Sequence, residues 1–270
     1  MSDPVSAADP GALHRRLSGA LLAARDRRSP IPPLTDSEPS LTVADAYAVA
    51  QLGVAADVAR GARPIGHKIG LTAEAVQRQL GVSTPDYGAL LDTMAIADGA
   101  TIDPGAYIAP RIEVELAFRL GAALHGPQVT VADVRAATES VHPSFELVDS
   151  RIADWRIRLA DTVADRGSAA GFVVGETGLA IDALDSAAVE VTLERDGEAV
   201  QRGRSDAVLG DPCASVAWLA AALAALGEPL QAGELVLSGA ITPMVSVAPG
   251  EQYRARFGAG LGELELRVRR

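Results

Sequence analysis

Apolar and polar positions alternate at helical spacing over the first sixty residues. Residues 11–28 place an apolar side chain at every third or fourth position, which predicts an amphipathic helix. A second helix is expected to start at Thr42, because Asp45 follows it as in a capping box. The Pro- and Ser-rich residues 29–40 predict a loop between the two helices. We therefore expect residues 1–61 to form an N-terminal helical segment.

From residue 62 onward the pattern changes to short apolar or alternating runs separated by Gly, Pro and Asp. Runs of this length and composition are typical of β-strands. The runs are RPIGHKIGL (63–71), PRIEVELAF (110–118), HPSFELVD (142–149), GFVVGE (171–176), AVEVTLERDGEAV (188–200), ELVLSGAI (234–241), QYRARF (252–257) and GELELRVRR (262–270). Asp196-Gly197 inside the fifth run predicts a tight hairpin turn.

Helical patterns are few in this part of the chain. They are TAEAVQRQLG (72–81), VTVADVRAATESV (129–141) and DPCASVAWLAAALAALG (211–227). So many strands with so few helices between them argue against a doubly wound parallel sheet. We predict an α+β, mostly β fold, in which residues 62–270 form a β-rich domain with a mixed-topology core and peripheral helices.

Composition and charge narrow the function classes. Apolar residues make up 48% of the chain, which is enough for a sizeable core. The net charge is −11 and no basic stripe is present, so no nucleic-acid partner is expected. The one cysteine, Cys213, excludes an intrachain disulfide, fits a reducing cytosol and lies in an apolar stretch that predicts packing. With no signal-peptide pattern and no apolar run of bilayer length, we expect a cytoplasmic protein without a membrane partner.

Two glutamates stand two positions apart in the strand PRIEVELAF. Alternation sends Glu113 and Glu115 to one face and their apolar neighbours to the other, with the two Cα atoms about 6.6 Å apart. Carboxylates about 5 Å apart repel by roughly 3 kcal/mol at an effective dielectric constant near 20. An exposed strand face would remove most of this cost. The strongly apolar flanks instead favour a strand covered on both faces.

A third acid, Glu146, lies among apolar residues in HPSFELVD. Three carboxylates on apolar strands are costly unless they are paired or bind a metal. Oxygen ligands without a cysteine or histidine cluster favour Mg²⁺ or Mn²⁺. An exposed acidic face and a metal site therefore both remain open at this point.

Lys68 is the only lysine in the chain, since every other basic side chain besides histidine is an arginine. Lysine can lose its proton when its pKa is lowered, whereas arginine cannot, so Lys68 is either a surface residue or a general acid or base. PDYG (85–88) predicts a turn in which Asp86 is a turn-former or a catalyst. DTVADRGS (161–168) predicts a polar loop that is a connector or supplies donors to an anion, and LSGAITPM (237–244) could place backbone amides beside a ligand.

Five segments in order resemble the 2-oxopent-4-enoate (2-hydroxypenta-2,4-dienoate) hydratases, and equally the 4-oxalocrotonate decarboxylases, of the fumarylacetoacetate hydrolase superfamily. The resemblance covers roughly residues 42–268, and the ordered set is far more specific than any one motif. The segments are GHKIGLTAEAVQRQLGVSTPDYGALL, PRIEVELAF, FELVDSRIADW, DTVAD and LSGAITPMVSVAPGE.

The resemblance implies the superfamily's rolled mixed β-sheet, with helical elements at its N-terminal side. It implies that Glu113, Glu115 and Glu146 share one divalent cation, Mg²⁺ or Mn²⁺, in a metal-binding catalytic domain. Lys68 matches the active-site lysine, and Asp86 matches the acidic residue of the P-D-[FY]-G turn.

Ser168 matches a serine near the carboxylate of the substrate, and we expect Leu71 and Thr242, in two of the matching segments, to contact the substrate as well. The chain departs from the family where the usual D-N-A-S reads D-R-G-S (165–168). Arg166 is therefore expected either to face solvent or to bind a larger, more anionic substrate.

The implied activity is a metal-dependent hydratase that adds water to a short 2-hydroxydienoate to give a 4-hydroxy-2-oxo acid, as in aromatic meta-cleavage catabolism. The alternative is a 4-oxalocrotonate-type decarboxylase or another 2-oxo-acid lyase or hydrolase, which differs in needing a cation for a distal carboxylate. A non-catalytic paralogue that binds a partner enzyme is a third reading, against which the retained lysine and glutamates argue. The resemblance also implies a small-molecule substrate, a homo-oligomer and a complex with a pathway partner enzyme.

Overall fold

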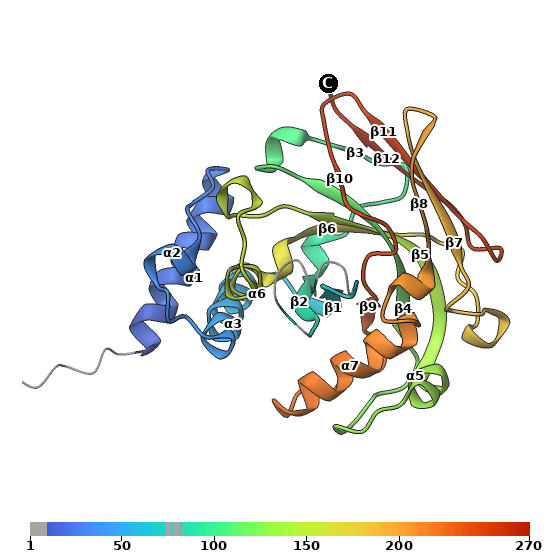
Figure 1. The fold of residues 1–270 in the computed structure, drawn as a ribbon, viewed down its shortest axis with the longest axis horizontal. Helices are drawn as coiled ribbons and strands as arrows, with labels where there is room; N and C mark the ends of the chain where they lie inside the picture. Colours follow the sequence, from blue (N-terminus) through green and yellow to red (C-terminus); the bar gives the residue numbers. More distant parts are fainter. Residues whose placement is uncertain (1–9, 74–76, 78–81, 83) are drawn as a thin grey trace, which may run out of the picture.

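The computed structural model describes residues 10–73, 77, 82 and 84–270, and it contains two curled β-sheets with helices gathered mainly at one side (Figure 1). The α-helices in the described residues are α1 (Pro10–Arg27), α2 (Leu34–Ser37), α3 (Val43–Ala59), α5 (Val131–Ala137), α6 (Leu159–Ala164) and α7 (Pro212–Ala224). The strands are β1 (Pro64–Gly70), β2 (Asp86–Leu91), β3 (Thr101–Ile102), β4 (Arg111–Leu120), β5 (Thr138–Val148), β6 (Ala169–Val174), β7 (Glu190–Arg195), β8 (Glu198–Arg204), β9 (Leu235–Leu237), β10 (Val245–Ser246), β11 (Gln252–Phe257) and β12 (Gly262–Val268).

The larger sheet has the strand order β2-β1-β9-β4-β5-β6, with β10 paired to β4. β1 and β9 are parallel, and the other neighbours in this sheet are antiparallel. The smaller sheet has the order β3-β12-β11-β7-β8. Apolar residues from both sheets, such as Val114 and Leu193, belong to one buried cluster, so the main core lies between them. The predicted mixed, mostly β fold is confirmed.

Strand β4 divides its side chains between two environments. Ile112, Val114 and Leu116 are fully buried in the main core. Glu113 and Glu115 alternate with them and therefore face the other side of the sheet. The alternation predicted from the sequence is confirmed, and it brings the two carboxylates to the face that carries the site described below.

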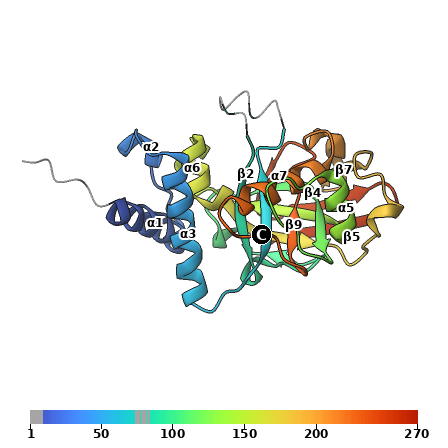
Figure 2. The same ribbon diagram turned by 90° about the horizontal axis from the view of Figure 1, so that it is seen from below.

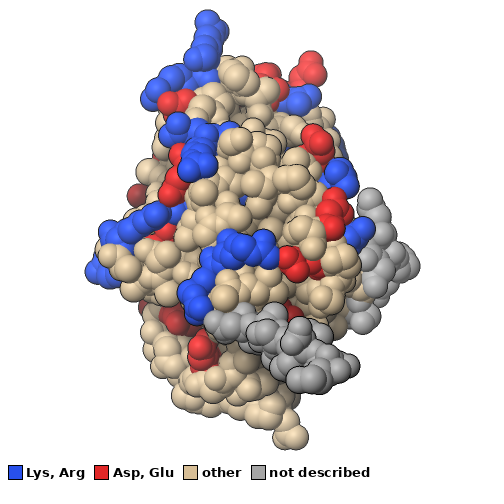
Figure 3. All heavy atoms as spheres, turned by 90° about the vertical axis from the view of Figure 1, so that its left-hand side faces the viewer, with Lys and Arg blue, Asp and Glu red and all other residues tan. Residues whose placement is uncertain are grey.

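The N-terminal helices pack on α6 and build a second, smaller core. Leu17 of α1, Val49 of α3 and Val163 of α6 are buried in it. Figure 2 shows these helices grouped at one end, away from most of the sheet. The surface on that side carries arginine side chains beside acidic ones (Figure 3), rather than one continuous patch of a single sign.

The start of α3 follows the sequence prediction. The Thr42 hydroxyl accepts a hydrogen bond from the Asp45 amide, and the Asp45 carboxylate accepts one from the Thr42 amide. This capping box satisfies two amides that a helix start would otherwise leave without partners. The boundary between residues 61 and 62 stays a prediction.

Helix α7 is an apolar helix of the protein interior. Among the described residues, one segment, Ser205–Ala224, is long and apolar enough to cross a membrane by length and composition alone. Half of that segment is buried inside the protein, where Val216 and Leu219 join the main core. Cys213 is also fully buried there, in agreement with a packing role.

Local structure differs from the prediction in three places. The helix expected over residues 129–141 ends at Ala137, because the chain enters β5 at Thr138. The turn expected at residues 85–88 is the beginning of β2. The polar loop expected over residues 161–168 is largely helix α6 followed by a buried 3₁₀ turn.

Two further predictions have different outcomes. The Asp196-Gly197 turn joins β7 to β8 with positive φ angles of 53° and 85°, as a tight hairpin requires, so that prediction is confirmed. The helix expected over residues 72–81 lies mostly outside the described residues.

Candidate active site

Three glutamates converge on one face of the larger sheet. Glu113 of β4 stands directly opposite Glu146 of β5, and Glu115 follows on the same face of β4. One carboxylate oxygen from each glutamate lies within 4.8 Å of the other two. Glu115 and Glu146 are fully buried, whereas Glu113 is partly exposed.

These carboxylates lack the partners that buried negative charges need. Within the described residues, Glu115 Oε1 and Glu146 Oε1 have no hydrogen-bond partner, and Glu115 Oε2 accepts one bond of 2.8 Å from the Gly239 amide. Burial raises the pKa of Glu115 well above its usual range, and repulsion by Glu146 and Glu113 adds to the rise. Burial also raises the pKa of Glu146 to about 7, although attraction to Lys68 opposes this. Orphaned, converging oxygens of this kind fit a hard divalent cation.

Lys68 supplies a positive charge beside the carboxylates. It lies on β1, which β9 connects to β4, and its Nζ atom is 3.1 Å from Glu146 Oε2. Burial alone would lower the pKa of Lys68, but the charges of Glu146 and its neighbouring carboxylates outweigh burial and raise the pKa. Lys68 is therefore an ammonium group at neutral pH, and it carries the proton that a general acid needs.

Glycines leave room for the Lys68 side chain. A Cβ atom at Gly167 would lie 3.2 Å from Lys68 Cδ and 3.4 Å from Nζ. A Cβ atom at Gly70 would lie 3.4 Å from Lys68 Nζ and only 2.2 Å from Asp86 Oδ1. The absence of side chains at these two positions lets the lysine and the aspartate approach each other across β1 and β2.

Asp86 is the second buried acid near Lys68. Its Oδ2 atom accepts a hydrogen bond of 3.3 Å from the Thr162 hydroxyl, and its Oδ1 atom has no hydrogen-bond partner among the described residues. Burial raises the pKa of Asp86, while Lys68 and Thr162 lower it in part. Asp86 thus combines a raised proton affinity with a free oxygen atom.

The site opens into a cavity of about 380 Å³. The predicted residues that line it are Lys68, Leu71, Asp86, Glu113, Ser168 and Thr242. Glu115 and Glu146 lie behind this lining. The remaining wall is mostly apolar, and its larger members are Ile69, Val148, Trp155, Ile157, Ile241, Pro243 and Met244. Lys68 is the only cationic side chain among the described lining residues.

Comparison with known proteins places this arrangement in a family. The family model described as fumarylacetoacetate (FAA) hydrolase C-terminal matches residues 66–269. The chain belongs to the fumarylacetoacetate hydrolase family. The matched region contains nearly all of both sheets and every predicted site residue, so the resemblance drawn from the sequence is confirmed.

Relatives within the fumarylacetoacetate hydrolase family include several hydratases. The chain is 43% identical over 245 residues to a 2-keto-4-pentenoate hydratase from Paraburkholderia xenovorans, with 91% of each chain covered. It is 45% identical over 241 residues to a 2-hydroxyhexa-2,4-dienoate hydratase from Comamonas testosteroni, covering 88% of this chain and 90% of the other.

A solved member of the family has nearly the same fold. The 4-oxalocrotonate decarboxylase from Pseudomonas putida G7, in a complex with magnesium and adipate, is 36% identical with a TM-score of 0.93. The match covers 95% of this chain and 97% of the decarboxylase. A fumarylpyruvate hydrolase from Pseudomonas aeruginosa is 19% identical over 77% of this chain and 89% of the hydrolase, with a TM-score of 0.61, which supports the shared family fold.

Arg166 lies apart from the other predicted site residues. Its side chain is buried, its Nη1 atom is 2.8 Å from Asp57 Oδ2, and it does not line the cavity. Neither expected location, solvent or substrate, matches this position. The two expected locations rest on the residues next to Arg166 in the sequence. The partner of Arg166 lies on the N-terminal helix α3, which this local pattern does not indicate.

Sequence reasoning missed three contributors to this family site. The Thr162 hydroxyl holds Asp86, the Gly239 amide holds Glu115, and Trp155 forms part of the cavity wall. The segments LSGAITPM and FELVDSRIADW pointed to Gly239 and Trp155 only as parts of motifs. For Thr162, the only signal was its place in a polar stretch that was expected to be a loop.

Proposed function

We propose that this protein is a divalent-metal-dependent hydratase, a hydro-lyase that converts a short 2-hydroxydienoate to a 4-hydroxy-2-oxo acid. Identities of 43–45% to hydratases over most of the chain support this proposal. The observation that carries it furthest is the apolar wall of the cavity. A substrate with one carboxylate and a hydrocarbon tail fits that wall, because nothing charged is then left buried without a partner.

The three glutamates would hold the cation, which we propose is Mg²⁺ or Mn²⁺. These ions prefer oxygen ligands and keep positions open for substrate oxygens. When bound, the cation would act as a Lewis acid for the carboxylate and C2 oxygen of the substrate. Ser168 and Thr242 line the same cavity and would contribute hydroxyl groups to substrate binding.

Lys68 and Asp86 would carry the protons. Lys68 is charged, so it would donate a proton to the far end of the dienol and would take up the proton that the C2 hydroxyl loses as it becomes a carbonyl. Asp86, with its free oxygen atom, would accept a proton from the water that adds at C4 and would pass that proton on to C3. The apolar wall would keep other water away from the reacting carbons.

A decarboxylase acting on 4-oxalocrotonate is the second candidate. The 36% identity to a decarboxylase that was solved with a dicarboxylate supports it, as does the position of Arg111. The Arg111 guanidinium carbon lies 4.3 Å from the centre of the Trp155 ring, and its Nη1 atom lies 3.4 Å from Met244 Sδ. Arg111 therefore contacts two side chains that line the cavity, and it would supply the cation for a distal carboxylate.

A paired assay separates the two candidates. Protein stripped with EDTA and reloaded with Mg²⁺ or Mn²⁺ receives either fresh 2-hydroxypenta-2,4-dienoate or 4-oxalocrotonate, and products are identified by mass. Metal-dependent gain of one water by the dienoate, without CO₂ release from 4-oxalocrotonate, is the expected result. CO₂ release from 4-oxalocrotonate without hydration of the dienoate would show that the protein is a decarboxylase. If the metal-bound protein acts on neither compound, this substrate class is rejected.

We further propose that the protein acts in the cytoplasm as a homo-oligomer and contacts the enzyme that supplies its substrate. The family resemblance supports these proposals. Gel filtration with light scattering, alone and with such an enzyme, tests the assembly.

A further inference from the structure

The turn formed by Arg166, Gly167 and Ser168 has an unusual backbone. All three residues are left-handed, with φ angles of 60°, 60° and 57°. Glycine adopts this conformation freely, but arginine and serine do so only when other contacts hold them. The Ser168 hydroxyl and amide both point back to Asp165, which stabilises one end of the turn. Something else must hold Arg166.

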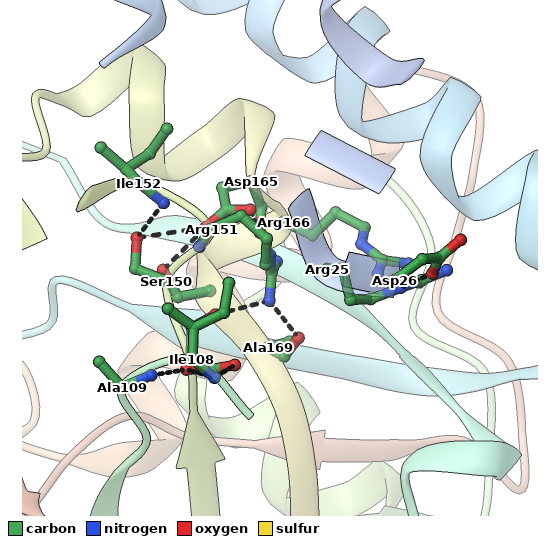
Figure 4. Close-up of polar contacts among 12 residues, drawn as sticks. Arg25, Asp26, Ile108, Ala109, Ser150, Arg151, Ile152, Asp165, Arg166 and Ala169 are labelled. Atoms are coloured by element: carbon green, nitrogen blue, oxygen red, sulfur yellow. Dashed lines mark hydrogen bonds and ion pairs between the residues drawn. The ribbon is translucent and has the colours of Figure 1, made fainter. Parts of the chain in front are cut away.

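A buried arginine secures the ends of the turn. Arg151 donates hydrogen bonds to the carboxylate and the carbonyl oxygen of Asp165, and Nη1 donates one of 3.1 Å to the Ala169 carbonyl (Figure 4). These contacts join the residues that precede and follow the turn. They do not reach the Arg166 side chain.

Asp57 of α3 holds Arg166 from the opposite side. Asp57 Oδ2 is 2.8 Å from Arg166 Nη1, and the same carboxylate accepts bonds of 2.7 and 2.9 Å from Arg25. Arg166 is only 5% exposed and is repelled by both Arg151 and Arg25. Asp57 is therefore the group that makes this buried guanidinium tolerable.

The inner side of the turn touches the catalytic lysine. Gly167 packs along the Lys68 stem, where an added Cβ atom would approach Cδ to 3.2 Å and Cε to 3.3 Å. The Arg166 carbonyl oxygen lies against Gly88, where an added Cβ atom would be 2.2 Å away. A shift of the turn would therefore change the space available to Lys68.

We propose that Arg166 is a positioning residue for Lys68, and that its ion pair with Asp57 holds the left-handed turn against the lysine side chain. Helix α3, which contributes no residue to the described cavity lining, thereby sets the orientation of the ammonium group. The proposal rests on the proposed hydratase function, in which Lys68 transfers protons. The proposal also accounts for the departure from the family sequence, which has asparagine at this place. Asparagine can adopt the left-handed conformation without help, whereas arginine depends on a distant partner, which Asp57 supplies.

The first test is the substitution Asp57→Asn. Turnover of the dienoate is expected to fall about tenfold or more, with KM changed less than about twofold, because proton transfer depends on lysine geometry more than substrate binding does. The matched control is Asp26→Asn, since Asp26 contacts Arg25 and Arg60 in the same charge cluster but not Arg166. The control is expected to keep wild-type turnover, and an equal loss in both variants would overturn the proposal.

The second test is a rescue. Asp57→Asn combined with Arg166→Asn removes the buried charge and places a residue that tolerates the left-handed turn. Turnover is expected to return to within about threefold of wild type, as strongly coupled neighbours do in a double-mutant cycle. A double variant as slow as Asp57→Asn alone would mean that Asp57 does not act through Arg166. If Asp57→Asn does not fold, Asp57→Glu keeps the charge with a longer side chain and is expected to give an intermediate kcat.

The third test does not depend on turnover. Lys68 is the only lysine, so acylation by an N-hydroxysuccinimide ester, followed by peptide mass spectrometry, reports on this one side chain. Labelling is expected to be about threefold faster or more in Asp57→Asn and to return to the wild-type rate in the double variant, because the turn controls local opening. Equal rates in all three proteins would refute positioning, whereas a wild-type protein inactive on dienoates but with the expected labelling pattern would refute only the hydratase proposal.

Discussion

Glu115 is the residue whose surroundings are least compatible with a negative charge. It is fully buried, two other glutamates repel it, and the Gly239 amide is its one hydrogen-bond donor among the described residues. Such a group is stable as a carboxylate only when a cation joins it. In the metal-free protein, burying this carboxylate costs free energy. Metal binding removes that cost, so we expect the metal to bind tightly.

We expect Glu115→Gln to fold and to lose most of its metal affinity. Removing one ligand should weaken Mg²⁺ or Mn²⁺ binding by more than about 100-fold, while the metal-free protein becomes more stable because its folded state no longer has to bury or protonate this carboxylate. Calorimetric titration with metal and thermal unfolding in EDTA measure both effects. Glu139→Gln, an exposed change on β5, is the matched control, and unaltered metal affinity in Glu115→Gln would remove Glu115 from the metal site.

Lys68→Met retains the aliphatic stem of the lysine and removes its charge. Turnover should fall by about 10²–10⁴-fold, the usual loss for a general acid, while metal affinity stays the same or increases because the carboxylates lose a competing cation. Steady-state kinetics and metal titration of the same preparation check this. A variant that turns over at close to the wild-type rate would show that another group donates the proton.

At the residue scale, the sequence indicated which side chains meet but not how they are paired. Alternation in PRIEVELAF was enough to place Glu113 and Glu115 together, since a strand has a fixed period of two. The pairing of Glu113 with Glu146 depends on the register between β4 and β5, which no local pattern encodes. The Arg166–Asp57 pair spans more than a hundred residues and has no local signature at all.

At the scale of elements, the stretch at residues 161–168 is the clearest difference between expectation and structure. Its polar composition predicted a loop, yet Asp161, Asp165 and Arg166 are all buried. Asp161 accepts hydrogen bonds from the amide and hydroxyl of Thr35, and Asp165 pairs with Arg151. Polar composition indicates exposure unless buried partners are available, and the partners of these residues lie on other elements, far away in the sequence.

The contact between β2 and the left-handed turn gives an element-scale prediction. In Gly88→Ala, the new Cβ atom would lie 2.2 Å from the Arg166 carbonyl oxygen, so the backbone of the turn must shift. We expect a loss of about 1–3 kcal/mol in unfolding free energy, as for other overpacked sites, together with reduced turnover. Denaturant unfolding and kinetics measure the two losses.

Gly19→Ala is the matched control for this prediction. Gly19 lies in α1 with no atom within 4 Å of an added Cβ, so alanine should raise stability by up to about 1 kcal/mol through its higher helix propensity. If Gly88→Ala matched the control in both stability and turnover, the close contact with the turn would have no energetic role.

For the whole molecule, metal binding and protonation should be linked. Glu146 has its pKa raised from 4.5 to about 7, so the folded metal-free protein retains a proton there that the unfolded chain loses. Metal must displace this proton. We expect metal affinity to fall as pH drops below 7, by at least tenfold per unit, with release of at least one proton on binding, because the pKa of Glu115 is raised as well.

Calorimetric titrations in two buffers of different ionisation enthalpy measure that proton release. The raised pKa of Glu146 also lowers the stability of the metal-free protein as pH rises from about 4.5 through 7, because protonated Glu146 is favoured only in the folded state. In Glu146→Gln both effects should become smaller, and the part that remains would come from Glu115, whose pKa is also raised. An affinity independent of pH between 5 and 8 would contradict the linkage.

The overall architecture was more predictable than its connections. Short strands with few helices between them indicated a mixed, mostly β core, and the family motifs indicated the rolled sheet. The order of strands was not accessible in this way, because β9 is only three residues long and lies between β1 and β4 through hydrogen bonds to both. A strand of three residues carries too short a pattern to predict which strands pair with it.

The insertion of β9 also has a consequence for how the protein is made. Lys68 and the three glutamates belong to the first 146 residues, yet β1 and β4 are joined through Leu235–Leu237, which are synthesised far later. A nascent chain that ends before β9 contains Lys68 and the three glutamates, and pairing of β4 with β5 aligns the glutamates, but it has no strand that joins β1 and Lys68 to them. Closure over so large a sequence separation is entropically slow. Catalytic competence is therefore among the last properties that the growing chain acquires, after most of its own sequence has left the ribosome.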